Sequence, residues 1–258
     1  MDGLALCARF SIATNRLAYC GPADAEPSLY DAILTGRGTP RAREALSRFE
    51  ALMPYLEAIG AANGRDPFDA EVVAAYWIGN ELLDQVDRAG MLRLLEALSR
   101  RGLPSALSRR LADHLPERSV PHHVFHVGYV GVGAVTGHVP TTVANIESCR
   151  PALAQVVRVE GGRLTVAGPV ARVEDGRLGL RGREERTLSW DPKALPDLSI
   201  DDRVAVHWSW PALRLTPEQA RSLETWTARS LEAANEGLGS MGVDLGRAPT
   251  PATSTERT

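Results

Sequence analysis

The chain has 258 residues, a formal net charge of −3 and a hydrophobic fraction of 44%. These values are typical of a soluble globular protein with one large or two ordinary domains, and they argue against nucleic-acid or membrane partners. No secretory signal and no apolar run of the roughly 20 residues that a membrane helix needs is present. The three cysteines (Cys7, Cys20 and Cys149) are too few and too far apart for a disulfide framework, which predicts a reducing cytoplasm.

The first half, residues 1–140, is predicted to be a mainly helical domain. Apolar residues recur every three or four positions over 40–63, which predicts one helix that stops at Gly64. Asp69 is the predicted N-cap of a second helix. One face of that helix would carry Val73, Tyr76, Trp77, Asn80, Leu83 and Val86. Two further helices are predicted over 89–99 and 104–114.

Residues 121–133 are β-branched and glycine-rich. They are compatible with a buried strand or with a loosely packed buried helix, and periodicity does not separate the two. The segment 141–148 is predicted to be a short helix that leads to Cys149.

After Cys149 the hydrophobic period changes to two, which predicts strands. One hairpin is expected to turn at Gly161-Gly162 and a second at Asp175-Gly176, since Asp-Gly is a strong hairpin signal. Further strands are expected over 187–190 and 204–208.

Thr216-Pro217-Glu218-Gln219 predicts a capping box that begins a final helix. From 237 to 258 the chain is rich in Gly, Pro, Ser and Thr, which predicts a disordered tail. The predicted fold class is α+β: a helical domain, then a small barrel and a C-terminal helix over 149–236.

The segment 149–225 resembles the HypC-type chaperones of hydrogenase maturation, which are small OB-like barrels. Cys149 stands where that family has its cysteine, Val156 follows at the family's distance, and Asp202 to His207 resembles its closing strand. The family's cysteine follows the initiator methionine, whereas Cys149 is internal. The resemblance implies a barrel whose cysteine contacts a metal fragment or a partner.

The whole chain also resembles an uncharacterised bacterial family associated with hydrogenase-maturation gene neighbourhoods. The matching motifs are Asn15-x-Leu17-x-Tyr19-Cys20-Gly21-Pro22, Tyr76-Trp77-Ile78-Gly79-Asn80 and Pro121-His122-His123-Val124-Phe125-His126-Val127. This resemblance implies a context in metalloenzyme assembly and a hydrogenase subunit or maturation protein as partner.

His122, His123 and His126 are the clearest candidate metal ligands. On a helix, histidines three or four apart share a face and can bind one ion, whereas a strand would separate His122 and His126 by about 13 Å. The alternative is that they are buried and bonded to the backbone or to carboxylates. Cys149 and Cys20 are candidate thiolate ligands for iron, nickel or zinc, or simply buried apolar side chains.

Five more residues are candidates for binding a ligand or partner. They are Tyr19, Tyr76, Asn80, Glu81 and His207. A buried Asn80 needs hydrogen-bond partners, which a neighbouring loop or a ligand would supply. Glu81 would act as a ligand or base, or lie on a solvated face, and His207 would bond the backbone or line a pocket.

Three functions remain open from the sequence. The first is an accessory protein, or chaperone, of [NiFe]-hydrogenase maturation that docks a partner or a metal fragment. The second is a metal-dependent enzyme that uses the histidine cluster with Glu81 or Cys20. The third is a small-molecule binding protein with its pocket between the helical domain and the barrel.

Overall fold

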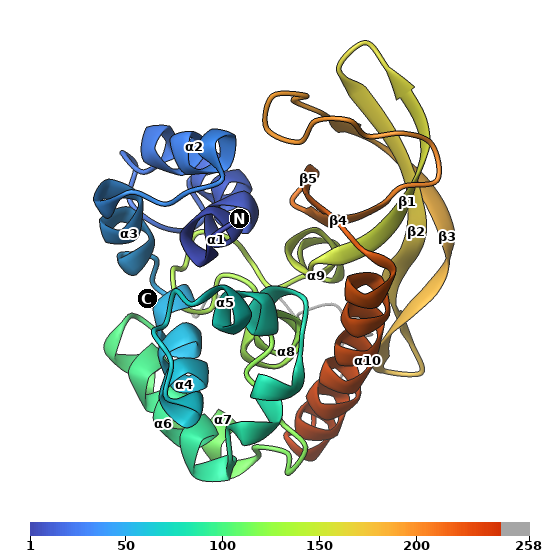
Figure 1. The fold of residues 1–258 in the computed structure, drawn as a ribbon. Coiled ribbons are helices and arrows are strands. Elements are labelled where there is room, and N and C mark those ends of the chain that lie inside the picture. The colour runs from blue at the N-terminus through green and yellow to red at the C-terminus, as the bar shows by residue number, and fades with distance from the viewer. Residues whose placement is uncertain (244–258) are drawn as a thin grey trace, which may run out of the picture.

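The computed structural model describes residues 1–243, and its fold class is α+β, as predicted (Figure 1). Helices and strands follow one another along the chain as α1 (Gly3–Arg16), α2 (Glu26–Thr35), α3 (Pro40–Ser47), α4 (Leu52–Asn63), α5 (Ala70–Trp77), η1 (Glu81–Gln85), α6 (Arg88–Arg100), α7 (Ser105–Asp113), α8 (His123–Phe125), η2 (His126–Gly131), α9 (Val143–Cys149), β1 (Ala152–Glu160), β2 (Arg163–Glu174), β3 (Arg177–Ser189), β4 (Arg203–His207), β5 (Trp210–Arg214) and α10 (Pro217–Ser240).

The five strands form one antiparallel sheet in the order β3-β2-β1-β4-β5. Both predicted hairpins are confirmed. Asp175 and Gly176 have φ angles of 51° and 71°, as a two-residue turn with left-handed backbone requires. The predicted strand over 187–190 is the end of the long strand β3. The hydrogen-bonded pairs give an open sheet with β3 and β5 at its edges.

The β4–β5 hairpin brings an unusual turn to the centre of the molecule. Trp208 and Ser209 link the two strands with φ angles of 48° and 59°, a conformation that favours glycine or asparagine. The Trp208 amide donates to the carbonyl of Ser148 at 2.7 Å. This bond ties the turn to the end of α9, next to Cys149.

Two helix predictions need correction. The helix expected over 40–63 is interrupted at 48–51, between α3 and α4, although it does end at Gly64. The helix capped by Asp69 ends at Trp77, because Gly79 adopts a φ of 94° that leaves the helical region. The chain then re-enters the short 3₁₀ helix η1. The predicted helices over 89–99 and 104–114 are confirmed as α6 and α7.

The ambiguous segment 121–133 is helical. A single turn of α-helix, α8, runs into the π-helix η2, and a positive φ at Gly131 ends it. A π-helix spaces side chains differently from an α-helix and occurs frequently at functional sites. The short helix predicted before Cys149 is confirmed as α9, which ends at Cys149 itself.

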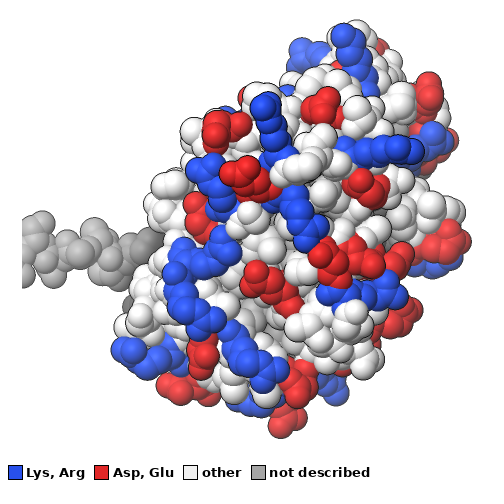
Figure 2. Space-filling model, turned by 60° about the vertical axis from the view of Figure 1, so that its left-hand side comes forward, with Lys and Arg blue, Asp and Glu red and all other residues white. Residues whose placement is uncertain are grey.

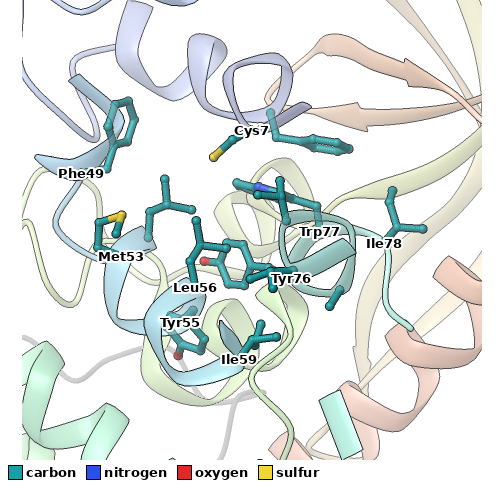
Figure 3. Packing of buried hydrophobic residues seen from close by; sticks show 14 of the residues in the cluster. Cys7, Phe49, Met53, Tyr55, Leu56, Ile59, Tyr76, Trp77 and Ile78 are labelled. Carbon is teal, nitrogen blue, oxygen red and sulfur yellow. The ribbon is translucent and has the colours of Figure 1, made fainter. Parts of the chain in front are cut away.

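Helices and sheet share their largest hydrophobic core. This core joins residues of α1, α4, α5, β5 and α10, across the expected domain boundary. Phe10 of α1 stacks on Trp77 of α5 with ring centroids 4.8 Å apart. Figure 3 shows Cys7 facing the indole of Trp77, with Tyr76 and Tyr55 packed beside it. The elements that carry the candidate residues are therefore held by one packed interior.

The last helix packs between the two parts of the fold. In Figure 1, α10 runs between α8 and β3. Asn235 bonds both backbone groups of Leu178 in β3 at 2.8 Å, and Ser230 bonds His122 at 3.2 Å. The helix continues to Ser240, four residues into the predicted tail, and residues 244–258 lie outside the described part.

The predicted capping box of α10 is present: Thr216 Oγ1 accepts from the Gln219 amide, and the Gln219 side chain accepts from the Thr216 amide. We expect Thr216→Ala to lower the free energy of unfolding by about 1 kcal/mol, because the cap bond is lost. Urea unfolding measures this, with Thr225→Ala, at an exposed position within α10, as the control. Equal effects of the two changes would contradict the role of the cap.

The surface carries charges of both signs. Figure 2 shows basic and acidic side chains intermingled on one face. Exposed ion pairs such as Arg16–Glu26, at 2.7 Å, stabilise a fold by at most about 1 kcal/mol each. Among residues 1–243, no helix combines the length and the apolarity needed to cross a membrane.

Candidate metal centre

Three side chains from distant parts of the chain converge in the interior. They are His123 at the start of α8, Cys149 at the end of α9 and His207 at the end of β4. One nitrogen of each imidazole and the Cys149 Sγ all lie within 4.8 Å of one another. The three residues are only 6%, 9% and 1% exposed. Two imidazoles and one thiolate are a suitable donor set for a transition metal.

The hydrogen bonding of His207 prepares it to act as a ligand. Its Nδ1 lies 2.6 Å from the carbonyl of Phe10, so Nδ1 carries the proton and donates. The other nitrogen, Nε2, is therefore a lone-pair acceptor, and it is buried with no hydrogen-bond partner in the described chain. Metal-binding histidines are commonly fixed in this way by a backbone carbonyl. A metal ion at Nε2 would satisfy an otherwise unpaired buried atom.

His123 is held on both sides of its ring. The Tyr76 hydroxyl donates to Nδ1 at 2.7 Å, and Nε2 donates to the carbonyl of Cys149 at 3.0 Å. The same Nε2 lies 3.7 Å from the Cys149 thiol. A metal at Nε2 would replace the bond to the carbonyl, while the Tyr76 hydroxyl would change its role and accept from Nδ1.

A buried ion pair anchors the chain at Cys149. Arg150, which is 1% exposed, bonds Glu147 at 2.7 Å and the carbonyl of Pro169 at 2.6 Å. Glu147 also accepts from the amide of Ala171 at 2.6 Å and pairs with Arg186 at 2.8 Å. These bonds join α9 to β2 and β3. They hold the backbone of α9 in place and thereby fix the position of the Cys149 thiol.

Burial sets the protonation states of the three candidate ligands. It raises the pKa of Cys149 to about 12, although the nearby Trp208 indole favours the thiolate, and it lowers the pKa of His207 to about 4. Burial, together with the neighbouring histidines, holds the pKa of His123 well below 6.5. At neutral pH the imidazoles are therefore neutral, and the thiol keeps its proton until a metal displaces it.

A cavity of about 50 Å³ adjoins the three ligand atoms. The residues that line it come from both halves of the chain: Ser11, Thr14, Tyr19, Cys20, Phe49, Ala51, Leu52, Tyr76, Trp77, His123, His126, Val132, Gly133, Val139, Cys149, His207 and Trp208. None of these carries a formal charge at neutral pH. Two of these lining residues, Tyr19 and Trp208, pack against one another with ring centroids 4.8 Å apart.

The predicted histidine cluster contributes only one of the three converging residues. His126 lines the cavity, but its Nδ1 bonds the Tyr55 hydroxyl at 3.0 Å, and its ring centroid is 6.1 Å from that of His123. His122 is the N-cap of α8 and bonds Ser230 on α10. The short helix therefore directs adjacent histidines to different neighbours.

Cys20 lies in the cavity wall, although its thiol is outside the close group. Asn15 shapes the surrounding turn, since its Nδ2 donates to the carbonyls of Cys20 and Pro22 at 3.2 and 2.8 Å. Gly21 has a φ of 76°, and a Cβ there would lie 2.4 Å from the Phe49 ring. The motif from Asn15 to Pro22 thus forms a turn that places Tyr19 and Cys20 in the cavity wall.

Two predicted ligand residues lie elsewhere. Asn80 caps η1 by accepting from the Leu82 amide, and it donates to the carbonyl of Glu71. Glu81 is exposed at the start of η1, as the solvated-face alternative predicted. Trp77 and Trp208 also line the cavity, and neither was predicted from the sequence to be a site residue. Trp208 was recognisable only as the residue after His207.

We expect the stability of the metal-free protein to depend on pH through its buried histidines. Burial lowers the pKa of His122 to about 3 and that of both His126 and His207 to about 4, while an unfolded histidine titrates near 6.5. Between those values the unfolded chain binds more protons than the folded chain. The free energy of unfolding is therefore highest above pH 6.5. As the pH drops toward 4, each of these histidines lowers it by about 1.4 kcal/mol for every pH unit.

Urea unfolding of chelator-treated protein between pH 7.5 and 5 measures this slope. His122→Asn should make the slope shallower, because one buried imidazole is removed. A free energy of unfolding that stays constant over this range would contradict the assignment of neutral, buried imidazoles.

Residues 1–241 match the family of unknown function DUF6390, and the chain belongs to that family. No curated protein and no solved structure matches the chain.

Proposed function

We propose that this protein binds one transition-metal ion through His123, Cys149 and His207. The observation that carries the proposal is the unpartnered, buried Nε2 of His207, held in its acceptor tautomer beside a thiol and a second imidazole. One thiolate and two imidazoles suit iron, nickel or zinc. Magnesium and calcium require oxygen ligands, so this donor set disfavours them.

We infer further that the metal serves metalloenzyme assembly, most concretely [NiFe]-hydrogenase maturation. The resemblance of residues 149–225 to HypC-type barrels depends on Cys149 at the start and on the closing strand that ends at His207. These two residues are also two of the three that converge. This agreement between the sequence resemblance and the spatial cluster supports the proposal. The protein would then dock a hydrogenase subunit or another maturation protein.

Two measurements on protein from a hydrogenase-producing host test this proposal. Anaerobic, chelator-free purification followed by elemental analysis should give about one equivalent of metal. Tagged protein at its native level should capture a hydrogenase or maturation subunit, and Cys149→Ser should lose it while Cys7→Ser retains it. Metal content near zero would contradict the metal site, and capture of no such subunit would contradict the role in maturation.

The cavity favours a second candidate, a metal-dependent enzyme acting on a very small substrate. Three protein ligands beside an empty space leave a coordination position for substrate, as in catalytic zinc sites. Turnover by the metal-loaded protein in the absence of any protein partner would favour this candidate over an accessory role.

A further inference from the structure

The three proposed metal ligands are buried, so an ion has to reach them through the wall of the adjoining cavity. Five residues of that wall are partly exposed and mark where the cavity approaches the surface: Tyr19, Cys20, Ala51, Gly133 and Trp208. These five residues form the mouth of the cavity. They lie in four connecting segments, which are the turn after α1, the break between α3 and α4, the loop after η2 and the β4–β5 turn.

One residue of the mouth, Cys20, has a side chain that binds transition metals strongly. A thiolate is a good ligand for zinc and iron, whereas the other four residues present aromatic rings, a methyl group or no side chain. Cys20 lines the same cavity of about 50 Å³ as the proposed ligand Cys149. The two thiols are close enough to interact, since Cys149 adds to the effect of burial in raising the pKa of Cys20. Cys20 therefore lies between the surface and the ligand atoms, although its thiol is outside their close group.

The turn that carries Cys20 is held in place by hydrogen bonds. The buried Asn15 donates to the Cys20 carbonyl at 3.2 Å, and the amide of Gly21 donates to the Glu50 carboxylate at 3.1 Å. The second bond joins this turn to the α3–α4 break, where the mouth residue Ala51 lies. The bonds on both sides of Cys20 keep its thiol at the mouth.

An ion that enters the cavity loses bound water before it contacts all three ligands. The wall includes Phe49, Leu52, Val132 and Val139, whose side chains offer no ligand atoms. A partly dehydrated cation without ligands in such surroundings is costly in free energy. A thiolate at the mouth lowers this cost, because it replaces water on the ion before the ion reaches the interior.

We propose that Cys20 is an entry ligand, which binds the incoming metal ion at the mouth and passes it to Cys149. The Cys20 thiol loses its proton to water as its bond to the metal forms. When Cys149 takes over the ion, the Cys149 thiol loses its proton, the bond between the metal and Cys20 breaks, and Cys20 regains a proton. One proton is released per ion, and no electron is transferred. This inference rests on the proposed metal site and adds the route by which the site is filled and emptied.

Stopped-flow absorption of the full-length protein, mixed anaerobically with cobalt(II), tests the inference. The thiolate-to-cobalt charge-transfer band reports the arrival of the ion at Cys149. Cys20→Ala should slow this arrival at least about tenfold, the lower end of what a residue outside the ligand set costs at a metal site. Release of cobalt to a chelator should slow by the same factor, because a transient ligand lowers the barrier in both directions. The affinity for cobalt should therefore stay unchanged.

The direction of the change separates an entry ligand from a residue that merely narrows the mouth. Alanine is smaller than cysteine, so removal of an obstacle would let the ion in faster. Cys20→Ser keeps the size of the side chain and should slow arrival as Cys20→Ala does. Cys7→Ala is the matched control, because the Cys7 thiol is completely buried and lies outside the cavity lining. It should leave both rates unchanged.

Arrival of cobalt that is unchanged or faster in the two Cys20 variants would overturn the inference, as would equal slowing in Cys7→Ala. A weaker affinity with an unchanged arrival rate would also overturn it, since Cys20 would then be a permanent ligand. If the unchanged protein shows no charge-transfer band, the proposed metal site itself is overturned, and the entry ligand with it.

Discussion

Cys149→Ser is expected to weaken metal binding by more than about 100-fold. The change keeps the size of the side chain but replaces the only thiolate of the site with a hydroxyl that stays protonated. Loss of a residue that merely supports a ligand already costs 10–100-fold in metal affinity, so loss of a ligand costs more. Competition between the protein and a chromogenic chelator measures the metal affinity of each variant.

Cys7→Ser is the matched control for this change. Cys7 is also completely buried, but its thiol faces Ser11 at 3.9 Å and lies outside the cavity lining. A second pair of variants repeats the comparison for the imidazoles. His207→Gln should lose affinity as Cys149→Ser does, whereas His122→Gln should keep it, although both histidines have a buried, unpartnered Nε2. Equal metal affinity within either pair would contradict the assignment of ligands.

The second large effect is expected on stability. Glu147→Ala should lower the free energy of unfolding by about 3–5 kcal/mol, because it leaves the Arg150 guanidinium buried without its counter-charge. The amide of Ala171 and the guanidinium of Arg186 lose their acceptor as well. Denaturant unfolding of metal-free protein measures the change without contribution from metal binding.

Glu174→Ala provides the comparison, since Glu174 pairs with Arg181 on the surface, where both side chains are more than half exposed. That pair should contribute less than about 1 kcal/mol. A loss at Glu147 as small as the loss at Glu174 would show that the network around Arg150 does not anchor the chain at Cys149.

Local signals predicted much of the fold. The turns at Gly161-Gly162 and Asp175-Gly176 set the β1–β2 and β2–β3 hairpins, and the capping box at Thr216 set the start of α10. These features depend on residues adjacent in sequence. The break at 48–51 was not predicted, because apolar residues continue at helical spacing through it while the backbone does not.

The candidate site was only partly predictable for a different reason. Adjacent histidines suggested one cluster, but α8 and the π-helix send His122 toward α10 and His123 toward Cys149. His207 reaches the same point only because β4 pairs with β1 directly after Cys149. Local signals for hairpins and helices do not determine which strands pair in the sheet. His123, Cys149 and His207 could therefore each be chosen from the sequence as candidates, but their convergence could not be predicted.

X-ray absorption spectroscopy of the protein loaded with one equivalent of zinc tests the metal site most directly. We expect one sulfur at about 2.3 Å and two imidazole nitrogens at about 2.0–2.1 Å from the metal. The sulfur shell should disappear in Cys149→Ser and persist in Cys7→Ser. A first shell of oxygen alone, or a sulfur shell that survives in Cys149→Ser, would contradict it.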